Sequence, residues 1–112
     1  MEQKDYLMRE VEKIGQLLRA LLGSLLQNKE NLSVTPDARF ENTREMLMRE
    51  IGFDLTAFLM LDETDTGIYL GQYKGIISEN IELLAEVMVQ LGLPGPPERK
   101  GLYLKKAIQL YE

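Results

Sequence analysis

The clearest hydrophobic pattern in this chain covers residues 4–27. Apolar residues recur there at alternating steps of four and three, at Leu7, Val11, Ile14, Leu18, Leu21 and Leu25. This spacing places one apolar stripe along one face of a helix. The stripe widens toward its C-terminal end through Leu17, Leu22 and Leu26. We therefore predict an amphipathic helix. The spacing also fits the seam of a coiled coil, but such a seam is narrower than this stripe. The wide stripe favours one wall of a globular core.

Capping residues mark the helices of the middle part. Thr35 precedes Pro36, and a hydroxyl N-cap followed by proline at the first helical position starts a helix well. Gly52 ends the next apolar pattern, because glycine readily takes the left-handed conformation just past a helix. Asp54 then caps a short helix. The helices predicted here cover 36–51, 54–61 and, less regularly, 65–73.

The C-terminal third predicts two further helices. Ser78 is a capping residue in front of an apolar face, and Gly92 followed by Pro94 ends that helix. In the last helix the inward face is predicted to hold Leu104, Ala107, Ile108 and Tyr111. The two helices cover 79–91 and 98–111. No stretch alternates apolar and polar residues over the length of a β-strand.

These elements predict an all-α fold, an irregular bundle of about five or six helices that forms a single domain over 1–112. Apolar residues make up 45% of the 112-residue chain, which is enough for one packed core. A domain this small has a limited margin of stability, and dimerisation is one way to increase it. The chain ends inside a predicted helix, which leaves open that the natural protein continues past Glu112.

Composition excludes many chemical functions. The chain has no cysteine and no histidine, which excludes disulfides, zinc fingers and iron–sulfur clusters and removes the usual general base near neutral pH. A net charge of −5 without a basic stripe argues against nucleic-acid binding. The most apolar stretch, 20–26, is too short to cross a membrane, and the N-terminus lacks a signal-peptide pattern. We expect a cytoplasmic protein that is not an enzyme and holds no cofactor.

Residues 62–73 partly match a calcium-binding loop. Asp62 and Thr66 fall at ligand positions, and Gly67 falls at the turn. Tyr73 occupies the position of the bidentate glutamate and cannot supply two charged oxygens. We therefore expect a helix-capping turn here and no metal site.

An acidic face is predicted on the helix over 79–91. Glu79, Glu82 and Glu86 lie at helical spacing, and paired carboxylates can perform acid–base chemistry or hold a metal. A solvated acidic face is the commoner reason for such a pattern, and we favour it. Lys105 and Lys106 on the next helix are expected to lie opposite the glutamates and screen them.

Two tyrosines and a lysine lie close together in a glycine-rich stretch. Tyr69, Tyr73 and Lys74 fall between Gly67 and Gly75. Tyrosines are common at interfaces, but no strand precedes this stretch as a phosphate-binding loop would require. We favour a role in the core and in a turn over a binding site.

The final third resembles a tetratricopeptide-type helical hairpin. Leu84-Ala85 with Met88 is similar to the first helix of that repeat, and Ala107 with Tyr111 is similar to the second. The connection over 92–99 is longer than in the family. The resemblance covers about residues 79–112 and implies a protein-binding scaffold without catalytic residues.

The opening stretch over 4–18 is also similar to small all-helical bacterial proteins of uncharacterised function. That resemblance implies a helical fold and no particular activity.

The sequence assigns no definite activity. We expect a non-enzymatic protein-interaction or adaptor domain whose partner is another protein or a second copy in a homodimer. The alternatives are a small ligand-binding module with a pocket between helices and a small enzyme that uses carboxylates or tyrosine. Two interaction surfaces are expected. One is the outer edge of the first helix, around Leu17, Leu22 and Leu26, and the other is the groove beside the final hairpin, near Met88, Tyr103 and Tyr111.

Overall fold

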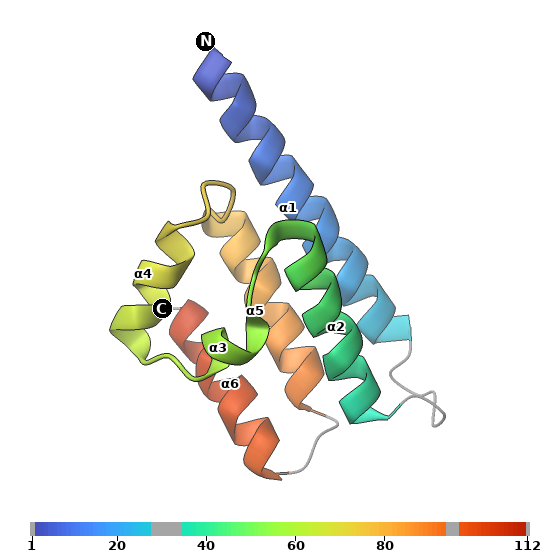
Figure 1. Cartoon of the computed structure of the whole chain (residues 1–112). Helices are drawn as coiled ribbons and strands as arrows, with labels where there is room; N and C mark the ends of the chain where they lie inside the picture. The colour runs from blue at the N-terminus through green and yellow to red at the C-terminus, as the bar shows by residue number, and fades with distance from the viewer. Residues whose placement is uncertain (1, 28–34, 94–96, 112) are drawn as a thin grey trace.

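The computed structural model describes residues 2–27, 35–93 and 97–111, and in these ranges the chain forms six helices and no strand (Figure 1). The all-α prediction is therefore confirmed. The helices are α1 (Glu2–Gln27), α2 (Pro36–Ile51), α3 (Leu55–Leu59), α4 (Glu63–Gly71), α5 (Ser78–Gly92) and α6 (Pro97–Tyr111).

The bundle is organised around α5. This helix packs most extensively on α6 and on α1, while α2 packs on α1, α3 and α5 (Figure 1). The short helices α3 and α4 connect α2 to α5 along the chain, and α3 packs on α2 and α6. Because α5 is covered from several sides, most of its apolar residues are buried whichever way they point.

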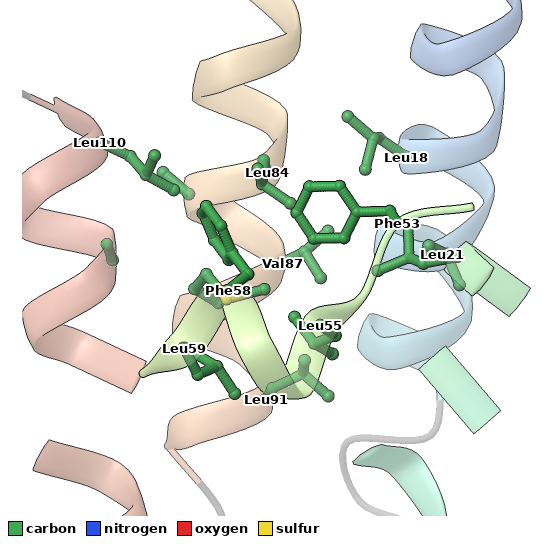
Figure 2. Packing of buried hydrophobic residues seen from close by; sticks show 14 of the residues in the cluster. Leu18, Leu21, Phe53, Leu55, Phe58, Leu59, Leu84, Val87, Leu91 and Leu110 are labelled. Atoms are coloured by element: carbon green, nitrogen blue, oxygen red, sulfur yellow. The ribbon is translucent and has the colours of Figure 1, made fainter. Parts of the chain in front are cut away.

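One hydrophobic core joins the helices. Phe53 and Phe58 lie near its centre with ring centroids 5.0 Å apart, and both are fully buried. Burying one such side chain contributes about 1.5–3 kcal/mol. Around these rings Figure 2 shows Leu18 and Leu21 of α1, Leu55 and Leu59 of α3, Leu84, Val87 and Leu91 of α5, and Leu110 of α6. The predicted stripe of the first helix is thus a core wall from Ile14 onward.

The predicted caps of α2 and α3 are confirmed. The Thr35 hydroxyl accepts the N–H of Ala38 at 3.1 Å, and the Asp54 carboxylate accepts the N–H of Ala57 at 3.1 Å. Gly52 has a φ of 66° and donates its N–H to a carbonyl of the last turn of α2. Phe53 then turns back into the core, as the position after such a glycine allows.

The predicted cap of α5 is wrong by one residue. Ser78 is the first residue of this helix rather than its N-cap, and Ile77 precedes it without a side-chain cap. The carbonyl of Ile77 accepts the first helical bond, from the N–H of Ile81 at 2.9 Å.

The segment over 62–73 is a capped helix, as the capping interpretation predicted. The Asp62 carboxylate accepts the N–H of Asp65 at 2.7 Å and so starts α4 two residues earlier than expected. Gly67 lies inside this helix and does not form a turn.

The predicted inward face of α6 is confirmed at Ala107 but is wrong at Ile108 and Tyr111. Ile108 and Tyr111 are exposed, and the buried residues are Tyr103, Lys106, Ala107 and Leu110. The predicted and the observed inward faces have the same helical spacing. The observed face contains a lysine, and a hydrophobic pattern treats lysine as a solvent-exposed residue. The lysine is buried because a carbonyl between α3 and α4 and a hydroxyl of α4 supply acceptors for its ammonium group.

Candidate functional site

Of the three residues predicted to line a binding groove beside the final hairpin, two lie in the core. Met88 and Tyr103 are core residues, because α5 lies inside the bundle and α6 closes over it. Their prediction as surface residues is wrong. Tyr111 is exposed at the end of α6, where its hydroxyl donates to the Glu86 carboxylate at 2.9 Å.

The other three residues lie along the C-terminal half of α1. Leu17 and Leu22 are half-buried and pack against the core. Leu26 is exposed. This edge of α1 therefore offers one exposed apolar side chain rather than a continuous patch.

The apolar surface that the sequence did not single out lies at the other end of α1. We call residues 6–13 the α1 arm. Helix α1 has 26 residues, against 16 in α2 and 15 in α5, so at 1.5 Å per residue it outreaches its neighbours. Figure 1 shows its N-terminal end extending past the other helices. On the arm Tyr6 is 55% exposed, Leu7 42% and Met8 62%.

The base of the arm is fixed to the bundle. Asn80 is buried and donates its side-chain N–H groups to the backbone carbonyls of Val11, at 3.0 Å, and of Gly75. Gly75 lies so close to α1 that a β-carbon on it would be 2.6 Å from the carbonyl oxygen of Glu10. The arm is therefore an extension of a helix whose root is held by hydrogen bonds and close packing.

A groove of about 460 Å³ runs beside the arm. One side is formed by the arm, and the other by the end of α2 and the segment after α4, which includes Lys74. Charges of both signs line it, with Glu10 and Lys13 on the arm and Glu50 and Lys74 across from it. Such a mixed lining suits contact with a protein surface better than capture of one small ion.

The acidic face of α5 borders a second hollow, of about 350 Å³. The predicted screening by Lys105 and Lys106 is wrong, because both lysines line a different cavity, between α3 and α6. The positive charge beside the glutamates comes from α1 instead. Within the described ranges no group of three metal-ligating side chains is assembled. This hollow is lined by Arg19, Glu79, Glu82, Leu83, Glu86 and Tyr111.

Lys106 is the most unusual titratable group of the fold, because it is a buried lysine. Its ammonium group donates to the carbonyl of Leu61 at 2.8 Å and to the hydroxyl of Thr66 at 2.5 Å. It also lies 4.9 Å from the centre of the Phe58 ring. Desolvation lowers the pKa of Lys106 below its usual value, an effect that the charge of Asp62 opposes. These contacts hold α6 against α3 and α4, so the amine is engaged within the fold.

Tyr69 and Tyr73 serve the turn after α2. The N–H of Asp54 donates to the Tyr69 hydroxyl at 2.8 Å, and the Tyr73 hydroxyl donates to the carbonyl of Gly52 at 3.0 Å. The two hydroxyls are 3.2 Å apart, and both rings pack against Phe53. Burial, followed by the hydrogen bond to Tyr69, raises the pKa of Tyr73. The geometry favours the role in the core and in a turn.

No protein-family model, no curated protein and no solved structure matches this chain. Across the part of the chain that the structure describes, no helix combines the length and apolar character needed to span a bilayer.

Proposed function

We propose that this protein is a non-enzymatic interaction domain that associates with a second copy of itself through the α1 arm. The observation that carries the proposal is that Tyr6, Leu7 and Met8 are all exposed at the end of α1 that extends past the rest of the bundle. Tyrosine and methionine are among the residues enriched in the cores of protein interfaces.

The arm continues the pattern that builds the core. Leu7 and Val11 have the same four-and-three spacing as Ile14 and Leu18, which are buried against α5. Val11 is half-buried at the base of the arm, but Leu7 is exposed. A helix from another molecule that packs on it would remove the same kind of surface from water.

The charges of the arm favour a second copy as the partner. Arg9 and Lys13 balance Glu10 and Glu12, whereas the whole chain carries a net charge of −5. Two copies therefore repel each other over most of their surfaces and least at the arm. A twofold axis through the arm would bring the same patch of both copies together, as in most homodimers.

We further propose that α5 and α6 form the tetratricopeptide-like scaffold that the resemblance implies, in a cytoplasmic bacterial protein. The two helices run in opposite directions and pack closely (Figure 1). The close approach of Gly92 to Tyr103 supports this, since such hairpins rely on small residues where helices meet.

Sedimentation velocity over about 1 µM to 1 mM tests self-association. We expect the wild-type chain to shift from monomer to dimer as concentration rises. The double variant Leu7→Glu, Met8→Glu is expected to stay monomeric, because dimerisation would bury its new carboxylates against the same carboxylates of the second copy.

Ile68→Glu is the matched control, because Ile68 on α4 is as exposed as Met8, at 62%. This variant should dimerise like the wild type. Circular dichroism melting verifies that all three proteins are folded. A wild-type chain that stays monomeric at the highest concentration overturns the proposal, as does a double variant that dimerises like the wild type.

A further inference from the structure

Arg39 of α2 is a buried arginine. Only 6% of its surface is exposed. Its Nε atom has no hydrogen-bond partner, and its guanidinium group forms no ion pair with any residue that the structure describes. An arginine stays charged in proteins, and burying an unpaired charge is costly. The fold therefore holds a cation that it does not itself neutralise within the described ranges.

The arginine lines a cavity between α1 and α2. The cavity has a volume of about 110 Å³, whereas a single water needs roughly 10–15 Å³ of such space. Its walls are largely apolar and include Leu21 and Leu25 of α1 and Met46 of α2. The polar residues that share it with Arg39 are Ser24, Asn42 and Thr43.

The geometry points to a binding site for a small carboxylate with a short aliphatic chain. A guanidinium group offers parallel N–H donors that match the two oxygens of a carboxylate, and Arg39, which lines the cavity, forms no ion pair with a described residue. The apolar walls suit the aliphatic part of the same molecule. An anion bound to Arg39 would supply the missing counter-charge.

The size and lining of the cavity select among anions. Inorganic phosphate would place polar oxygens against Leu21, Leu25 and Met46, which offer no hydrogen bonds. A folded protein surface cannot enter a space of about 110 Å³. The cavity lies on the C-terminal half of α1, away from the α1 arm, so this inference does not depend on self-association.

Butyrate is a suitable probe, with butyramide as its uncharged counterpart. Thermal unfolding of the full chain, followed by circular dichroism at constant ionic strength, should show stabilisation by butyrate and not by butyramide or phosphate. In nuclear magnetic resonance spectra, the butyrate methyl protons should show nuclear Overhauser effects to the methyl group of Met46.

Arg39→Met removes the guanidinium while keeping an apolar side chain in its place. We expect its affinity for butyrate to fall at least about tenfold, since the charged hydrogen bonds are lost. Arg44→Met is the matched control, because Arg44 lies on the same helix but is paired with Glu41 at 2.8 Å. It should bind butyrate like the wild type.

Equal stabilisation by butyrate and butyramide overturns the inference, and so does equal affinity in the Arg39 variant. Stabilisation by phosphate to the same extent also contradicts it. If the Arg39 variant does not fold, two measurements on the wild type decide. Butyrate must stabilise the protein more than butyramide does, and its methyl protons must show nuclear Overhauser effects to Met46. The absence of either result refutes the site.

Discussion

Gly92 and Tyr103 lie so close together that a β-carbon built on Gly92 would be 2.7 Å from the Cβ atom of Tyr103. Both residues are buried. Gly92 is the last residue of α5, and Tyr103 points inward from α6. This contact sets how closely the two helices approach, and it requires the absence of a side chain at position 92.

The first prediction concerns this approach. Gly92→Ala should lower the free energy of unfolding by about 1–3 kcal/mol, because the added methyl group must push the helices apart. Gly23→Ala is the control, since a β-carbon there would meet no atom within 4 Å apart from its chain neighbours and the nearby backbone of its own helix. It should raise the stability by about 0.5–1 kcal/mol through helix propensity. Urea denaturation of both variants measures the difference, and stabilisation by Gly92→Ala would refute the close contact.

The second prediction concerns Asn80, which holds α1 to the segment before α5. Asn80→Asp replaces a donor by a carboxylate that faces two carbonyl oxygens. We expect a loss of about 3–5 kcal/mol at neutral pH, as for other unpaired buried charges.

The loss in Asn80→Asp should shrink as the pH falls, because protonation removes the buried charge and restores one donor. Gln16→Glu, the same amide-to-carboxylate change at an exposed position of α1, is the control and should change stability by about 0.5 kcal/mol or less. Equal stabilities of the two variants across pH would show that the amide of Asn80 is not required.

The third prediction tests the core wall formed by α1. Leu18 and Leu21 are buried, so truncating either to alanine should lower the free energy of unfolding by about 2–5 kcal/mol. Leu26→Ala lies on the same helix at an exposed position and should cost less than about 1 kcal/mol. Denaturant titration compares the three variants. A loss below 1 kcal/mol at Leu18 would mean that the stripe does not form the core.

The fourth prediction follows from the raised pKa of Tyr73, which burial and the hydrogen bond to Tyr69 cause. The folded chain keeps this phenol protonated above its ordinary pKa of 10, while the unfolded chain releases the proton. The stabilisation is therefore fully present below pH 10 and is lost as the pH rises above that value.

Tyr73→Phe removes this titration. Denaturation at several pH values should show wild-type stability falling more steeply above pH 10 than that of the variant. Tyr6→Phe, on the exposed arm, is the control and should leave the wild-type slope unchanged. Parallel pH curves for wild type and Tyr73→Phe would contradict the assignment of the raised pKa to this phenol.

The sequence by itself determined the features that depend on local spacing. The stripe of α1, the left-handed turn at Gly52 and the N-cap at Asp54 were all predictable, because each depends on residues within one or two turns. Locally formed helices and their caps therefore settled the all-α class.

The tertiary structure decided which faces are covered. The apolar stripe of α1 is buried at Ile14 and exposed at Leu7, because the neighbouring helices do not extend as far as Leu7. The sequence of α1 alone does not indicate where its neighbours end. The burial of Lys106 depends on acceptors at Leu61 and Thr66, about forty residues earlier in the chain. The sequence pattern of the helix over 36–51 likewise gave no sign that Arg39 is buried, and the packing of α2 on α1 encloses this residue. Contacts between distant segments give a polar side chain a buried environment, and local periodicity carries no information about them.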